Sequence, residues 1–164
     1  MIIDMKTAQL KNQKGFTLIE LLVVIGILAV LLAITLIAIN PARQFAQANN
    51  TKRSSDVNAI LNAVGQYAAD NHGSLPAGLT ANCSAAACDV TGVVAAGNID
   101  LCPALVTSYL AALPVDPLTN NGTPVSTCNA TYVAGYTIQV SAADNRVTVT
   151  APAAELSQVI SVTR

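Results

Sequence analysis

KGFTLIELLVVI, residues 14–25, is the stretch on which the organisation of this chain depends. The apolar run continues behind it to Ile39, and the 24 residues from Phe16 to Ile39 contain a single charged residue, Glu20. As an α-helix these residues would be about 36 Å long at ~1.5 Å per residue, more than the ~30 Å hydrocarbon core of a membrane. We therefore predict a membrane-spanning helix over residues 16–40.

The charges on either side of the apolar run predict its orientation. Residues 1–15 carry three lysines and one aspartate, a net charge of +2, and the rest of the chain carries five Lys and Arg against eight Asp and Glu, a net charge of −3. Positive charges before a membrane helix favour a cytoplasmic N-terminus and an extracytoplasmic C-terminus. An ordinary secretory signal would have a shorter apolar core with its cleavage site behind it. A plain signal anchor would account for length and orientation but not for Glu20.

Glu20 is costly in this position, because an acidic residue at mid-membrane costs about 2.5 to 3.5 kcal/mol. An ionised carboxylate there needs a cationic partner, and the sequence after it offers no Lys or Arg before Arg43. About 23 residues of helix, some 34 Å, would separate the two side chains within one chain. Arg43 of the same chain therefore cannot reach Glu20.

The stretch KGFTLIELLVVI resembles the class III signal sequence of type IV pilins and type II secretion pseudopilins. The resemblance is dense over residues 14–39 and only architectural beyond about residue 70. It implies that residues 1–15 are a leader removed by a membrane peptidase that cuts after Gly15, and that the new N-terminal Phe16 is N-methylated. It also implies that Glu20 guides subunit assembly by meeting the cationic α-amine of Phe16 in a neighbouring subunit.

The sequence next predicts an amphipathic continuation of the helix over residues 41–73. Gly73, with a proline shortly behind it, marks the expected helix end because glycine readily takes the left-handed cap conformation. Apolar side chains recur with helical spacing along one stripe, which comprises Val57, Ile60, Leu61, Val64 and Ala68.

Residues 47–56, in the first half of this helix, are almost wholly polar. The stretch allows two interpretations. It is either a solvated face, which we favour slightly, or a surface on which Lys52, Arg53 and Asp56 contact neighbouring subunits.

Residues 74–164 are expected to form an extracytoplasmic globular domain. Runs rich in Thr, Val, Tyr and Ile predict two strands, at residues 131–141 and 146–151, joined by a hairpin turn. The remaining expected elements are a short strand, a short helix and an edge strand, at residues 90–95, 103–112 and 155–163. The predicted fold class is α+β and pilin-like, with a long N-terminal α-helix packed on a small antiparallel β-sheet.

All four cysteines lie in the segment predicted to be outside the cytoplasm, where an even number of cysteines indicates disulfides. Four cysteines allow three pairings. We favour Cys83 with Cys88, which closes a short loop, and Cys102 with Cys128, which would tie the short helix to the sheet. Structural zinc is the competing interpretation, but a C-x4-C spacing without a nearby histidine fits it poorly.

The segment LPVDP, residues 113–117, resembles the part of major pseudopilins that precedes a calcium-binding loop. Asp116, Asn120 and Asn121 would supply the oxygen ligands that calcium prefers, with Thr123 as a further oxygen. A proline-rich turn without metal is the interpretation we favour, because one carboxylate among amides is a thin ligand set. Leu118 also replaces the aromatic residue of the family. Apart from this calcium candidate, we expect no cofactor.

The sequence contains no pattern typical of an active site, so we predict that the protein is not an enzyme. Its single histidine, His72, lies at the expected helix end and has no evident catalytic partner. Neither a Gly-rich phosphate loop nor a G-x-S-x-G motif is present, and the carboxylates are scattered along the chain.

Together these features predict a structural prepilin that polymerises into a type IV pilus or a pseudopilus, serving adhesion, motility, DNA uptake or protein secretion. Its expected partners are other pilin subunits, the prepilin peptidase and methyltransferase, and the inner (cytoplasmic) membrane before assembly. The final location would be an extracellular pilus or a periplasmic pseudopilus. Two alternatives stay open: a low-abundance filament-tip module that binds DNA or a surface ligand, and a monomeric membrane-anchored protein. Without a basic patch, broad nucleic-acid binding is not expected.

Overall fold

The computed structural model of the chain describes residues 15–93, 97–129 and 131–164. The expected leader, except for Gly15, lies outside the described residues, as does the end of the strand predicted at 90–95. The chain divides into two compact units, the first ending at Pro41 and the second comprising Ala42–Arg164. Each unit is described by itself.

The first unit contains α1, Leu18–Ile39, a helix of 22 residues in which no side chain is buried. Its length and apolar composition suffice to cross a membrane. The helix starts two residues later than the predicted membrane segment, because Thr17 occupies the N-cap position with an extended backbone. It ends at Asn40, whose φ of 47° is left-handed. The following Pro41 disfavours a right-handed helical conformation at that residue, and so accounts for the break.

The next helix, α2, spans Pro41–Asp70. Four members of the predicted apolar stripe are buried, and Ala68 is half-buried. The helix ends in a left-handed cap at His72, with a φ of 55°, followed by Gly73 with a φ of 86°. The Gly73 N–H donates to the Ala68 carbonyl at 2.7 Å, which closes the last turn. The cap therefore uses the histidine as well as the glycine that the sequence indicated.

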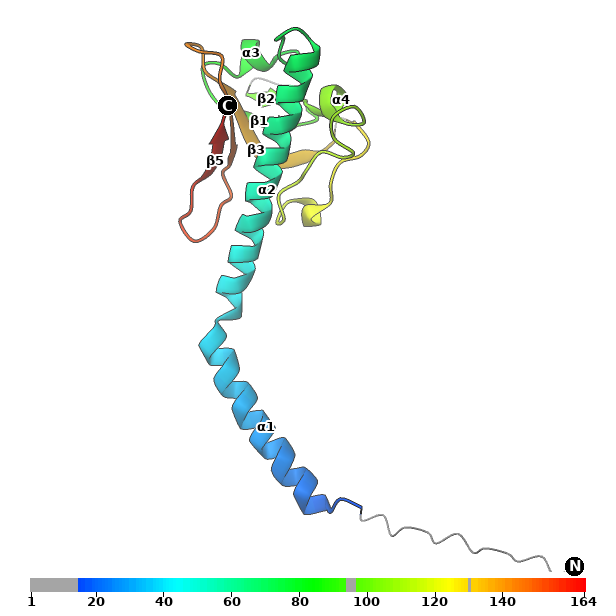
Figure 1. Cartoon of the computed structure of the whole chain (residues 1–164), viewed down its shortest axis with the longest axis vertical. Helices are drawn as coiled ribbons and strands as arrows, with labels where there is room; N and C mark the ends of the chain where they lie inside the picture. Colours follow the sequence, from blue (N-terminus) through cyan, green and yellow to red (C-terminus); the bar gives the residue numbers. More distant parts are fainter. Residues whose placement is uncertain (1–14, 94–96, 130) are drawn as a thin grey trace, which may run out of the picture. The chain divides into compact units, whose positions relative to one another are not determined.

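A five-stranded sheet faces α2, with strand order β2-β1-β3-β4-β5 (Figure 1). Only the β1–β2 pair is parallel, and the other three pairs are antiparallel. In chain order, the strands are β1 Cys88–Thr91, β2 Asn98–Ile99, β3 Val133–Val140, β4 Val147–Ala151 and β5 Ile160–Thr163. The predicted hairpin is therefore β3–β4, and the predicted edge strand is β5. The α+β, pilin-like fold class predicted from the sequence is confirmed.

The hydrophobic core of the second unit lies between α2 and one face of this sheet. Along β3 and β4 every second residue is buried, as the alternation in their sequences predicts. The other face carries hydroxyl side chains in cross-strand pairs, such as Thr148 with Thr163 at 2.8 Å and Thr150 with Ser161 at 3.1 Å. One buried face and one polar face is the usual arrangement of an antiparallel sheet packed on a helix.

Three short helical segments complete the described fold: α3 Leu79–Asn82, α4 Cys102–Leu105 and the 3-10 turn η1 Asn120–Gly122. The prediction of a helix over residues 103–112 is wrong in its length, because α4 stops at Leu105. The Leu105 carbonyl accepts the N–H groups of both Tyr109 and Leu110 at 3.0 Å. These bonds form a turn in place of further helix. The turn places the Tyr109 ring edge-on against Tyr67 of α2, with centroids 5.8 Å apart.

Candidate processing and assembly site

Glu20, the single charged residue of the apolar run, lies in the first turn of α1 and forms a capping box with Thr17. Its Oε2 accepts the Thr17 backbone N–H at 2.8 Å and the Thr17 hydroxyl at 2.7 Å. In return, the Glu20 N–H donates to the Thr17 hydroxyl oxygen at 3.3 Å. These bonds satisfy N–H groups that the start of a helix otherwise leaves unpaired, and a carboxylate there also meets the positive end of the helix dipole.

This local partner was missed in the sequence analysis, which sought only a cation for Glu20. The signal was present, because Thr-x-x-Glu before an apolar run is the sequence signature of a capping box. The carboxylate of a lone chain thus has polar donors from Thr17. A cationic partner from another chain would add to these donors rather than replace them.

Gly15 and Phe16, the predicted cleavage residues, precede α1 in irregular backbone and are both exposed. Phe16 as a whole residue is 86% exposed. A Cβ added at Gly15 would meet nothing within 4 Å, so nothing in the described part of the chain itself requires glycine there. Both residues are therefore accessible in the lone chain, just before the start of the helix.

The same segment is the part of the chain that matches a known protein family. Residues 10–36 match the family model of the prokaryotic N-terminal methylation motif. The match includes Gly15, Phe16 and Glu20, and it confirms the class III signal sequence of type IV pilins and pseudopilins that we identified in the sequence. No curated protein and no solved structure matches the chain.

Away from this segment, the polar stretch of α2 is organised around Arg53, whose side chain is completely buried. Its Nε donates to Asp116 Oδ2 at 2.6 Å and its Nη2 to Asp116 Oδ1 at 3.2 Å. Its Nη1 donates to Asn50 Oδ1 at 2.9 Å and to Glu155 Oε2 at 2.8 Å. We call Asn50, Arg53, Asp116 and Glu155 the arginine cluster.

The arginine cluster corrects both interpretations where Arg53 is concerned, whereas six residues of the stretch, Lys52 among them, are exposed as on a solvated face. Arg53 neither lies on a solvated face nor is available to a neighbouring subunit, because its guanidinium is bonded inside the second unit. Asp56 is likewise engaged, since the Tyr136 hydroxyl donates to its Oδ2 at 2.7 Å. Burial raises the pKa of Asp56, and the bond from Tyr136 partly opposes that rise.

The spacing of the buried residues shows what the sequence analysis overlooked. Arg53 and Asn50 lie four and seven residues before Val57, so they continue the apolar stripe of α2 with polar side chains. Helical spacing could have placed them on the buried face. It could not have supplied their partners, because Asp116 and Glu155 are remote in the sequence.

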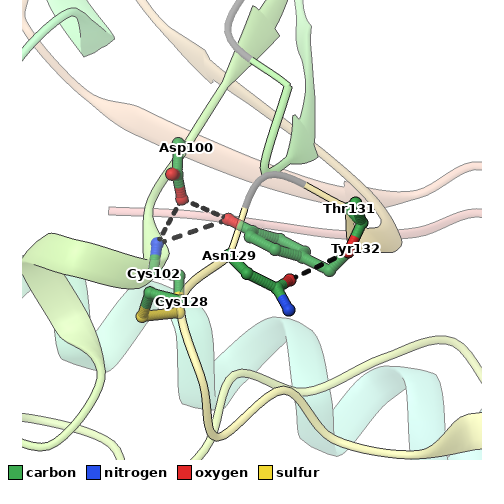
Figure 2. Close-up of a disulfide and its surroundings, with 6 residues drawn as sticks. All are labelled: Asp100, Cys102, Cys128, Asn129, Thr131 and Tyr132. Carbon is green, nitrogen blue, oxygen red and sulfur yellow. Dashed lines mark hydrogen bonds between the residues drawn. A yellow bond between two sulfur atoms is a disulfide. The ribbon is translucent and has the colours of Figure 1, made fainter.

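The cysteines form two disulfides, Cys83–Cys88 and Cys102–Cys128, the pairing that the sequence favoured. The second bridge joins the start of α4 to the segment that leads into β3. Figure 2 shows the Asp100 carboxylate beside it, where Oδ1 accepts the Tyr132 hydroxyl at 2.5 Å and the Cys102 N–H at 3.0 Å. Burial, followed by the adjacent Asp100 carboxylate, raises the pKa of Tyr132.

The three calcium candidates differ in their surroundings. Asp116 is fully buried, and both of its carboxylate oxygens accept hydrogen bonds from Arg53. Asn120 and Asn121 lie exposed in η1, both with left-handed backbones. Within the described ranges, no group of three or more His, Cys, Asp or Glu side chains could hold a metal ion.

Proposed function

We propose that this chain is a prepilin that is cut between Gly15 and Phe16, N-methylated at Phe16, and polymerised into a type IV pilus or a pseudopilus. The observation that carries the proposal is the methylation motif at residues 10–36, which leads directly into α1. The motif points to a structural role and to anchoring in the inner membrane before assembly. It fits a pilin-like subunit, and filament yield rather than the motif distinguishes that subunit from a tip module or a monomeric anchored protein.

The exposure of α1 supports a role in assembly. All of its side chains are exposed in the lone chain, including leucine, isoleucine and valine residues along its whole length. An apolar surface of this extent needs either lipid or other apolar helices around it. Lipid would serve before assembly, and the α1 helices of neighbouring subunits would serve within a filament. Gly26 would allow close helix approach, because glycine has no Cβ that would hold a neighbouring helix away.

Glu20 would have two roles in this proposal. In the free subunit its capping box with Thr17 defines the start of α1. In the filament its carboxylate would also bind the methylated α-amine of Phe16 from a neighbouring subunit, which pairs two charges in an apolar setting and sets the axial register. An intermolecular pair of this kind depends on the charge of Glu20, whereas the capping box depends on both side chains.

Intact-mass analysis of sheared surface filaments tests the processing. We expect a chain that begins at methylated Phe16, and replacement of Gly15 by leucine should leave the leader attached. A mature chain that begins at Met1, or after residue 39, would overturn the proposal. The yield of filament also separates the alternatives, because a tip module would be rare in filaments and a monomeric anchor would give none.

Two matched variants test the role of Glu20. Glu20→Gln keeps the size of the side chain and an oxygen acceptor for Thr17 but removes the charge. Thr17→Val removes the capping hydroxyl and keeps the charge, at a cost of about 1 kcal/mol to the helix start. We expect both variants to be inserted and cut, with normal filament yield from Thr17→Val and few or no filaments from Glu20→Gln. Normal assembly of Glu20→Gln would refute the intermolecular pair.

A further inference from the structure

Residues 114–123, which we call the proline–asparagine loop, pack against α2 through their backbone carbonyls. The loop is folded on itself by hydrogen bonds from the Thr119 N–H to the Asp116 carbonyl at 2.9 Å and from the Gly122 N–H to the Thr119 carbonyl at 2.8 Å. This folding directs two other carbonyls, those of Val115 and Gly122, toward the same side chain of α2. A cluster of oxygen acceptors of this kind attracts a cation.

The cation among these oxygens is the ammonium group of Lys52. Its Nζ lies 3.2 Å from the Val115 carbonyl oxygen and 3.4 Å from the Gly122 carbonyl oxygen. It also lies 3.9 Å from Asp56 Oδ2, one helical turn further along α2. An ammonium has three N–H donors and no acceptor, so it can bond both carbonyls, while Asp56 at 3.9 Å is beyond hydrogen-bond distance and adds only charge attraction.

The loop backbone is shaped to admit this ammonium. Gly122 has a φ of 64°, and a Cβ there would lie 3.3 Å from Lys52 Nζ and 3.2 Å from Pro117 Cα. Any other residue would therefore press on both the ammonium and the loop. Gly135 of β3 leaves room for the loop itself, because its φ is 78° and a Cβ there would lie 2.8 Å from the Cβ of Asp116.

A second cation of α2 neutralises the carboxylate of the loop. Asp116 is the loop's only carboxylate, and its oxygens take two bonds from Arg53 and one from the Leu118 N–H at 2.9 Å. Calcium is held by six to eight oxygens at about 2.3–2.6 Å, with carboxylates supplying most of the charge. Here the single carboxylate is already paired, and the carbonyls already face an ammonium, so the residues present do not fit calcium.

We propose that Lys52 and Arg53 act as built-in cations of the proline–asparagine loop, so that this protein folds and holds the loop without calcium. The two positive charges come from adjacent residues of one helix. Lys52 binds the carbonyls of the loop, and Arg53 binds its carboxylate. Loop geometry is then insensitive to the calcium concentration around the domain.

Thermal unfolding of the full chain in detergent micelles, followed by tyrosine near-UV circular dichroism, tests the proposal. For the wild type we expect the same Tm, within about 1 °C, in 5 mM calcium chloride and in 5 mM EGTA. Titration calorimetry with calcium chloride should show no binding below about 1 mM. A Tm that rises by about 3 °C or more with calcium, or binding below about 1 mM, would overturn the proposal.

The variant Lys52→Met keeps the apolar stem and removes the ammonium, and we expect its Tm to fall by about 2 °C or more in either solution, a modest change because the Lys52 side chain is 42% exposed. Arg146→Met is the matched control, because it also removes one positive charge, from an exposed residue beside the β3–β4 turn. Its Tm should stay within about 1 °C of the wild type. An unchanged Tm for Lys52→Met would refute the role of the ammonium. If Lys52→Met fails to fold, the wild-type comparison in calcium and EGTA still decides the question. These experiments measure stability and calcium binding, not filament formation. A negative result would therefore overturn this inference without bearing on the proposed function.

Discussion

Replacing Arg53 by methionine removes the centre of the arginine cluster while keeping an unbranched apolar side chain. The carboxylate of Asp116, fully buried in the wild type, would lose its two bonds from the guanidinium and its opposite charge. Removing one partner of a buried ion pair typically costs about 3 to 5 kcal/mol, because the other charge remains in a site that water does not reach. Glu155 should add little to this cost, since its side chain is 32% exposed and can be hydrated.

This loss is large for a domain of this size. At about 0.05–0.15 kcal/mol per residue, the second unit, Ala42–Arg164, would have a total stability of roughly 6 to 18 kcal/mol. A loss of about 3 to 5 kcal/mol should lower Tm by roughly 10 to 20 °C. Urea unfolding of the full chain in detergent micelles measures the lost free energy of unfolding. The signal comes from the chain's four tyrosines, because tryptophan is absent.

A second substitution tests the physical reason. Asp116→Asn in the Arg53→Met background removes the buried charge and keeps an oxygen for the Leu118 N–H. We therefore expect the double variant to recover more than half of the lost stability, as a double-mutant cycle would show. Arg146→Met again serves as the exposed control, with an expected change within about 0.5 kcal/mol. Our reasoning is refuted if Arg53→Met loses less than about 1 kcal/mol, or if the second substitution destabilises the protein further.

Three other predictions concern the second unit. Non-reducing peptide mapping should find no free thiol among the four cysteines, and replacing Cys102 and Cys128 by serine should cost about 3 to 4 kcal/mol in urea unfolding; four alkylatable thiols in native protein would contradict the framework. Asn49, and then Arg53, lower the pKa of Glu155 from its ordinary 4.5, so its contribution to stability is present above pH 4.5 and is lost as the pH falls through the lowered value. The stability advantage of the wild type over Glu155→Gln should accordingly shrink in acid, and an advantage that grows there would reverse the sign of our argument. Finally, Gly135→Ala should cost about 2 kcal/mol or more, because a Cβ there would lie 2.8 Å from Asp116 Cβ at a φ of 78°, and an alanine variant with wild-type Tm would show that the loop yields easily.

Several features of this protein could be predicted from the sequence because each depends on residues that are close together in the chain. The length and composition of the apolar run predict α1, and the adjacent signal motif is a contiguous string. The spacing of Val57 to Val64 predicts the buried face of the second half of α2. Alternation within residues 147–151 predicts β4 in the same way. The capping box of Thr17 and Glu20 was equally local and was readable, although it was overlooked.

Other features were decided only by the tertiary structure, because they join groups that local patterns do not relate. Arg53 meets Asp116 and Glu155 across 63 and 102 residues of sequence, so Asn50 and Arg53 are buried within a polar stretch whose other residues are mostly exposed. The end of α4 at Leu105 is accompanied by the contact of Tyr109 with Tyr67 of α2, a long-range pairing that helix propensity does not include. A charged side chain can be buried only where its partners are positioned around it. That positioning is set by how α2, the proline–asparagine loop and the segment before β5 pack together, not by the sequence near any one of them.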